Sequence, residues 1–316
     1  MFGNTAIQTE SETDAAREKK ILALVPLFRE VGNLKRIRAA NLGNSFAADL
    51  FERAWGRISG GANARTVAVD ITKDAVIAAA LGAINEKVLR EAKLENVQIE
   101  LITTRAFDVS ATFVDKDLRD AMRDRIAAPI DDGRSSNVPE FVCLLIAQPR
   151  SGATKTGEPK RVFDQPENHA EHCLAVAVIG ALLAAVFDAD AETVFLIGLI
   201  HHFHNAYLPD SGFAGEEALG EFLPAIFETF RRKCLAEVAE NLHEKIWELF
   251  KEIELADTPE ARAFHAADVI DRVLQMRHHA EANEFTLRYA LEEAELVHAG
   301  AVQNFHYEIL RAARLI

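Results

Sequence analysis

Three histidines follow a strongly apolar run near the middle of the chain. The segment V-F-L-I-G-L-I-H-H-F-H-N-A-Y-L-P-D places His201, His202 and His204 directly after this run. The length of the run, counted from Glu192, favours a buried helix. Imidazole is the commonest protein ligand for transition metals. The pattern therefore indicates a metal site, provided that other elements supply ligands to meet these rings.

Two other segments offer metal ligands at helical spacing. The string E-N-H-A-E-H places His169 and His172 three positions apart, and so on one helical face. In F-H-A-A-D-V-I-D-R, Asp268 shares a face with His265 and with Asp271. Each residue alone is more simply a core histidine or a solvent-facing aspartate. Their occurrence on three successive helical segments predicts one divalent metal ion with mixed His/Asp ligands, which suits Mn, Co, Fe, Ni or Zn.

These segments, taken in order, resemble the HD-domain metal-dependent phosphohydrolase superfamily. The likeness is greatest to the bacterial 5′-deoxynucleotidase branch, whose motif runs His-Asp, two residues, Glu, four residues, Asp. Here the same spacing reads His201-His202, two residues, Asn205, four residues, Asp210. The resemblance spans roughly residues 160–300 and leaves the N-terminal half unexplained.

The resemblance implies roles for individual residues. His172, His201 and Asp268 match the metal ligands of the family. Asp210 matches the family residue near the leaving oxygen, and Arg161 is a looser match for a phosphate contact. The activity implied is hydrolysis of a phosphate ester on a nucleotide-like small molecule, with a metal-activated water as the nucleophile.

Two positions depart from the family pattern. His202 stands where the family has an aspartate, and because imidazole can still ligate, the predicted ligand set becomes three His and one Asp. Asn205 stands where the branch has a glutamate, and a carboxamide cannot take a proton from water. Asn205 is expected to contact substrate. Another group must act as the base, and the candidates are His204, Asp210 and Glu171.

The same departures keep other functions open. A catalytically inactive HD-fold binding or regulatory protein is the second hypothesis, because both substitutions fall within the motif. An HD-fold di-iron oxygenase is the third, although His204, His243 and His265 have no spacing that matches such enzymes. An unrelated helical bundle is the fourth. About one bound metal ion favours the phosphohydrolase, about two favour the oxygenase, and none favours the binding module.

All of the predicted ligands fall in a region with helical periodicity. Residues 164–316 form the expected all-α HD-type domain. Residues 1–150 are expected to form a smaller N-terminal α+β (or helical) region of unknown role, and residues 151–163 a linker. The predicted strands are the β-branched or alternating segments 66–71, 97–104, 107–114 and 141–147. The expected fold class is therefore α+β overall.

Composition limits the class of partner. The net charge of −14 argues against nucleic-acid binding as the main role. The three cysteines form no CxxC pair, so neither a disulfide framework nor a structural zinc knuckle is expected. Residues 174–187 and 194–200 are too short or too interrupted to span a membrane, and residues 1–20 do not resemble a signal peptide. We expect a cytoplasmic protein with a small-molecule substrate, and a homodimer stays open.

Overall fold

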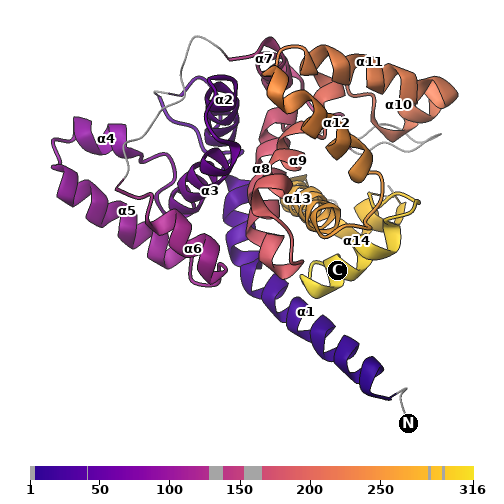
Figure 1. The fold of residues 1–316 in the computed structure, drawn as a ribbon, viewed down its shortest axis with the longest axis horizontal. Helices are drawn as coiled ribbons and strands as arrows, with labels where there is room; N and C mark the ends of the chain where they lie inside the picture. The colour runs from indigo at the N-terminus through magenta and orange to yellow at the C-terminus, as the bar shows by residue number, and fades with distance from the viewer. Residues whose placement is uncertain (1–3, 41, 128–137, 153–165, 284–285, 294–295) are drawn as a thin grey trace.

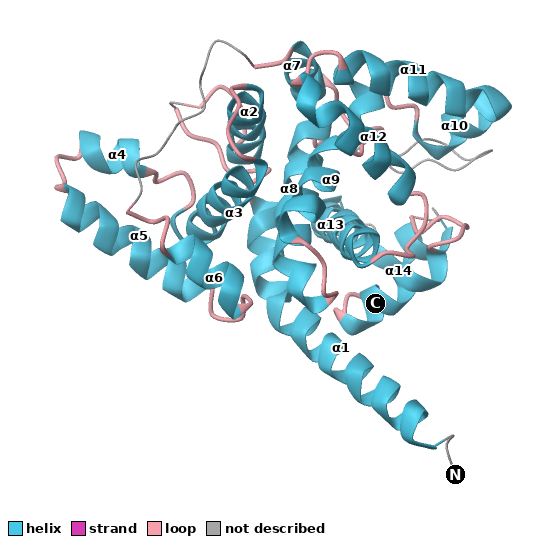
Figure 2. Ribbon diagram, viewed as in Figure 1, coloured by secondary structure: helices cyan, strands magenta, loops and turns pink. Residues whose placement is uncertain are grey.

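The chain folds into α-helices joined by loops and short 3₁₀ turns, as seen in a computed structural model (Figures 1 and 2). The structure describes residues 4–40, 42–127, 138–152, 166–283, 286–293 and 296–316. The helices are α1 (Asn4–Asn33), α2 (Phe46–Ser59), α3 (Ala64–Leu81), α4 (Glu86–Glu91), α5 (Asn96–Ser110), α6 (Lys116–Arg123), α7 (Glu140–Ala147), α8 (His169–Leu183), α9 (Ala191–Ile200), α10 (Gly212–Leu219), α11 (Leu223–Leu235), α12 (His243–Glu252), α13 (Pro259–Asn283) and α14 (Gln303–Ala312).

The predicted α+β class is wrong, because the segments predicted as strands are helical. Residues 66–71 lie inside α3, residues 97–104 inside α5 and residues 141–147 inside α7. Residues 107–114 continue α5 and end in a turn. The only β contact in the described part of the chain is one isolated bridge, between Pro149 and Asn168. The N-terminal region is therefore helical, like the C-terminal one.

Helix caps outside the apolar runs explain this outcome. The Asn63 side chain accepts a hydrogen bond from the backbone of Thr66 and starts α3. Glu95 and Gln98 form a capping box that starts α5. Such caps satisfy backbone groups that are otherwise unpaired in the first helical turn. A short run rich in β-branched residues does not outweigh them, since β propensity depends strongly on context.

Two glycines let the most apolar helices, α8 and α9, approach closely. A Cβ atom added to Gly198 would lie 2.4 Å from the Cα atom of Ala177. A Cβ atom added to Gly180 would lie 2.6 Å from the side chain of Val194. Packed interiors have no room for such contacts. The glycines therefore permit backbone-to-backbone packing, which brings the first turn of α8 beside the last turn of α9.

Helix α13 completes the centre of the molecule and packs against both α8 and α9 (Figure 1). Its contact face carries small side chains, including Ala263, Ala266 and Ala267, all fully buried. Small residues allow a long helix to lie close to its neighbours. This packing carries the polar residue after Ala267, which is Asp268, to the junction of α8 and α9.

Within the described residues, one segment is apolar and long enough to cross a membrane by composition. It is His169–Val186, with a mean hydropathy of 1.8, and 89% of it is buried inside the protein. Such burial is what a core helix of a soluble protein shows.

Both predicted regions contribute to one hydrophobic core. Helices α1, α2 and α3 contact α8. The rings of Trp55, Phe141 and Phe203 pack against one another, with centroids 4.7 to 5.3 Å apart. The division into residues 1–150 and 164–316 stays a prediction. Most of the predicted linker 151–163 lies outside the described residues.

Candidate metal centre

His172 lies in the first turn of α8, where a capping box fixes its position. The Asn168 side chain accepts from the backbone of Glu171, and the Glu171 carboxylate accepts from the backbone of Asn168. The fully buried His172 ring donates from Nδ1 to Oδ2 of Asp271, at 2.7 Å. Its Nε2 has no hydrogen-bond partner in the described chain and lies 3.2 Å from Oδ1 of Asp268. Nε2 is therefore the atom left for a ligand.

His201 ends α9 and is oriented in the same way. Its Nδ1 lies 2.8 Å from the carbonyl oxygen of Gly198, which can only accept a hydrogen bond. Nδ1 therefore carries the proton, and burial lowers the pKa of the ring to about 3, so that the ring is neutral near pH 7. Nε2 is then an unprotonated nitrogen, buried and without a partner among the described residues.

His202 is oriented through a relay of two hydrogen bonds. The Asn205 amide nitrogen donates to the carbonyl oxygen of Leu208, at 3.2 Å. This bond turns Oδ1 of Asn205 toward Nδ1 of His202, 2.7 Å away. An amide oxygen can only accept, so Nδ1 of His202 carries the proton and Nε2 is free to ligate. Burial, followed by the neighbouring His201, holds the pKa of His202 well below its usual value.

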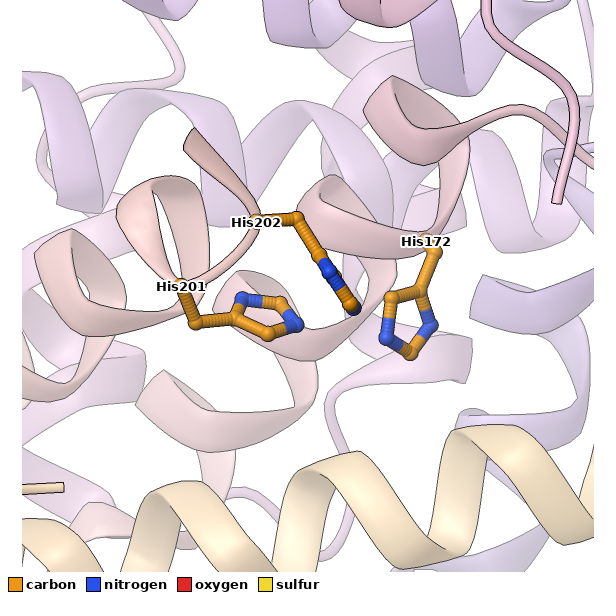
Figure 3. Close-up of side chains that lie close together, drawn as sticks. All are labelled: His172, His201 and His202. Carbon is orange, nitrogen blue, oxygen red and sulfur yellow. The ribbon is translucent and has the colours of Figure 1, made fainter. Parts of the chain in front are cut away.

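The three rings turn toward one another (Figure 3). One nitrogen from each of His172, His201 and His202 lies within 4.8 Å of the others. Asp268 adds a carboxylate oxygen on the α13 side, and Arg272, one turn further along α13, lies 3.6 Å from it. Burial opposes ionisation of Asp268, but its close contact with His172 and the charge of Arg272 hold its pKa well below its usual value. Imidazole nitrogens that converge beside an ionised carboxylate fit a divalent transition metal ion.

A comparison with family models agrees with this geometry. A model described as HD domain matches residues 145–309, which is more than half of the 316-residue chain. The chain belongs to the HD domain family. The predicted superfamily is thereby confirmed, and the 5′-deoxynucleotidase branch stays a prediction. Comparisons with curated proteins and with solved structures found no match.

A cavity of about 270 Å³ opens beside the histidines of this HD domain. Its described lining includes side chains that can ligate a metal ion or carry charge, among them His201, His202, Asp268, Arg150 and Asp210. The Asp210 carboxylate accepts from two backbone N–H groups, those of Ser151 and Gly212. The cavity therefore joins the metal centre to a fixed carboxylate and a guanidinium group.

Arg150 is held in the cavity wall by the backbone around it. The bridge between Pro149 and Asn168 and the hydrogen bond from the Arg150 N–H to the Glu167 carbonyl fix this strand-like turn. Nε of Arg150 lies 3.4 Å from a carboxylate oxygen of Glu167. Nη1 is buried and has no hydrogen-bond partner among the described residues. A buried guanidinium donor without an acceptor favours an anionic ligand such as phosphate.

The other predicted site residues lie in different surroundings. His204 stacks on Phe227 of α11, with ring centroids 3.9 Å apart, and it is not part of the described cavity wall. Burial, then Arg231, holds the pKa of His204 well below its usual value, which makes it a weak base. Glu171 is engaged in the α8 capping box and lies 3.5 Å from Arg38. Arg161 lies outside the described residues.

Sequence reasoning missed three roles at this centre. Arg150 was one cation among several in a loop, and only the bridge between the preceding Pro149 and Asn168 places it in the cavity. Asp271 shares a helical face with Asp268, but its place behind His172 is set by tertiary packing. Asn205, expected to contact substrate, lines the cavity and also orients His202. The i, i+3 spacing of His202 and Asn205 was the one available signal.

A second, larger cavity of about 950 Å³ lies among α2, α3, α4 and α5. Its charged side chains pair with one another, as Arg53 does with Asp74 at 2.8 Å and Arg90 does with Glu86. No cluster of three or more potential metal ligands was found there among the described residues. The smaller cavity is therefore the candidate functional site.

Proposed function

We propose that this HD-domain protein is a divalent-metal-dependent phosphohydrolase that cleaves a phosphate monoester of a nucleotide-like molecule. One observation carries the proposal: partnerless ring nitrogens meet an ionised aspartate beside the unpaired guanidinium nitrogen of Arg150. Membership in the HD domain family supports metal-dependent phosphohydrolase chemistry. The substrate and its nucleotide character are part of the proposal.

His172, His201, His202 and Asp268 would hold one divalent ion. Three neutral imidazoles and one carboxylate favour Mn, Co, Fe, Ni or Zn over the harder Mg or Ca. When bound, the ion supplies a water of lowered pKa and polarises a phosphoryl oxygen. The hydrogen bonds from each Nδ1 atom keep the three rings in the required tautomer and orientation.

Arg150 is the proposed phosphate-binding residue, in place of the Arg161 that the resemblance suggested. Its guanidinium can donate to two phosphoryl oxygens at once. Glu167, on its far side, fixes the orientation of the fork. Burial opposes the charge of Arg150, but the surrounding carboxylates, led by Glu167 and Asp210, outweigh it and raise the pKa. Arg150 therefore stays charged. It supplies a local positive charge for the anionic substrate in a chain whose net charge is −14.

Asp210 is the best placed of the three candidate bases. It lines the cavity, whereas His204 stacks on Phe227 and Glu171 caps α8. We assign Asp210 the proton of the attacking water. The water oxygen bonds to phosphorus, the ester P–O bond breaks, and the proton passes through the Asp210 carboxylate to the leaving alkoxide.

The lining of the cavity also favours a flat ring on the substrate. Phe213 and His298 stack there, with ring centroids 4.6 Å apart and planes 13° apart. Aromatic faces of this kind bind heteroaromatic rings by offset stacking. A cavity of about 270 Å³ limits the substrate to the size of one nucleotide.

The test is phosphate release from a panel of nucleoside monophosphates, with purified protein loaded in turn with Mn, Co, Ni, Fe(II) or Zn. The expected result is metal-dependent release from at least one nucleotide, abolished in His201→Ala. Hydrolysis of 4-nitrophenyl phosphate alone would refute the nucleotide specificity. Metal binding without hydrolysis of any ester would favour the inactive binding or regulatory protein.

A further inference from the structure

A second group of potential metal ligands lies behind His172. Carboxylate oxygens of Glu167 and Asp271 and a ring nitrogen of His172 lie within 4.8 Å of one another. The Lys35 ammonium sits between the two carboxylates: Nζ is 2.7 Å from Oε2 of Glu167 and 2.7 Å from both oxygens of Asp271. The side chains of Lys35 and Asp271 are almost completely buried.

We propose that Lys35 is a built-in cation that fills a second metal position and so limits the centre to one metal ion. The proposal deepens the proposed function, because it assumes that the first position, formed by His172, His201, His202 and Asp268, binds metal. Lys35 is thus a positioning residue that acts through Asp271 and Glu167.

Charge balance is the first argument. Two buried carboxylates side by side are costly unless a cation neutralises them. An ammonium group supplies one positive charge and three N–H donors, and here it makes contacts to three carboxylate oxygens. A divalent ion would serve the same oxygens and would also gain a histidine nitrogen. The ammonium prevents this, because it occupies the space between the oxygens and repels a second cation.

Orientation of His172 is the second argument. Nδ1 of His172 donates to Oδ2 of Asp271, and this bond turns Nε2 toward Asp268. If a metal ion bound at Asp271, it would compete for Nδ1 and weaken that arrangement. Lys35 holds Asp271 as a hydrogen-bond acceptor and thereby reserves His172 for the first position.

Lys35 lies outside the part of the chain that matches the HD domain model. The HD domain match begins at residue 145, and Lys35 follows α1, 132 residues before Glu167 and 236 before Asp271. The N-terminal region, for which sequence analysis indicated no role, therefore contributes a side chain to the surroundings of the candidate metal centre.

The test is the metal stoichiometry of Lys35→Met, measured by elemental analysis after dialysis against Mn or Zn. We expect about one equivalent in the wild type and about two in Lys35→Met. Lys35→Met/Glu167→Gln, which removes one carboxylate together with the ammonium, should return to about one. Lys73→Met is the matched control: it removes a buried lysine near Asp70 and Asp74, which keep arginine partners, and should not gain metal.

Each outcome separates this proposal from the proposed function. One equivalent in both the wild type and Lys35→Met overturns the role of Lys35 and leaves the phosphohydrolase standing. No metal in the wild type but one in Lys35→Met supports Lys35 and refutes the first metal position. A second equivalent that persists in the double variant overturns the proposal, because the added ion then lies elsewhere. If Lys35→Met does not fold, Lys35→Gln, which keeps donors for both carboxylates, is measured by the same criteria.

Discussion

His172 stands between two polar clusters that satisfy their hydrogen bonds in different ways. On its Nε2 side, the histidine cluster (His172, His201 and His202) brings three ring nitrogens together, and those of His172 and His201 have no partner among the described residues. On its Nδ1 side, the lysine cluster (Lys35, Glu167 and Asp271) is fully charged, and its members bond to one another at 2.7 Å.

This difference indicates which cluster is suited to bind a ligand from outside the chain. Buried polar atoms are normally paired, so a group of partnerless atoms at one point marks a binding site. A closed network marks a structural support. The two clusters share one imidazole, and its two nitrogens face opposite ways. The lysine cluster can therefore set the orientation of the histidine cluster without touching the substrate.

Removal of one ring from the histidine cluster should have the largest effect. His201→Ala deletes one of four proposed ligands and should lower metal affinity by at least roughly 100-fold, since a four-ligand site gains about 3 kcal/mol or more from each ligand. Phosphate release should fall with it. Isothermal titration with Zn or Mn gives the affinity. Unchanged affinity would place the metal elsewhere.

Removal of the proposed phosphate contact should separate substrate binding from metal binding. Arg150→Met should lower kcat/KM by about 100-fold, because one charge-assisted donor to a transition state of this kind is lost. Metal stoichiometry should not change. Arg150→Lys keeps the positive charge but lacks the planar guanidinium group, so its kcat/KM should lie between those of the wild type and Arg150→Met. A loss of metal in Arg150→Met would instead give Arg150 a structural role.

The two clusters should also respond to acid in different pH ranges. In metal-free protein, His201 has a folded-state pKa of about 3 against an ordinary value of 6.5. Below pH 6.5 the unfolded chain binds a proton that the folded chain does not, so stability falls as the pH drops toward 3, by about 1.4 kcal/mol per pH unit. Asp271, opposed by burial but favoured by Lys35, has a pKa of about 2. Its contribution is lost only below about pH 4.

Guanidinium unfolding at pH 7 and pH 4.5, with chelator present, measures this difference. The free energy of unfolding should drop between the two pH values in the wild type and drop less in His201→Asn. An equal drop in both proteins would mean that His201 is protonated in the folded state at pH 4.5. The lysine cluster should contribute little to the change in this range.

The sequence allowed prediction of the ligands but not of what supports them. His172, His201 and Asp268 were found because helical spacing and residue type are local properties, and the structure brings them together. Whether they bind metal stays a prediction. The pairing of Lys35 with Asp271 spans 236 residues, and no local pattern indicates a contact of that kind. The stacking of His204 on Phe227, which moves it away from the cavity, is non-local in the same way.

The predicted strands failed for a related reason. The segment 66–71 is rich in β-branched residues, but Asn63 caps a helix just before it. Once α3 begins, Val67, Ile71 and Ala75 face the core at helical spacing, and all three are fully buried. The helix cap and burial on one helical face together, not the composition of a short run, decided the secondary structure.

The smallest expected effect concerns the relay that orients His202. Asn205→Ala removes the acceptor for Nδ1 of His202, and the loss of such a support should lower metal affinity by about 10-fold. Asn205→Asp is the matched variant, because a carboxylate oxygen can accept the same hydrogen bond and restores the acidic group that the resemblance expects there. Its metal affinity should equal or exceed that of the wild type. If both variants bind metal as tightly as the wild type does, His202 either needs no support from Asn205 or is not a ligand. Metal titration of His202→Ala decides between these two explanations. If His202 is a ligand that needs no support, His202→Ala should lose metal affinity as His201→Ala does.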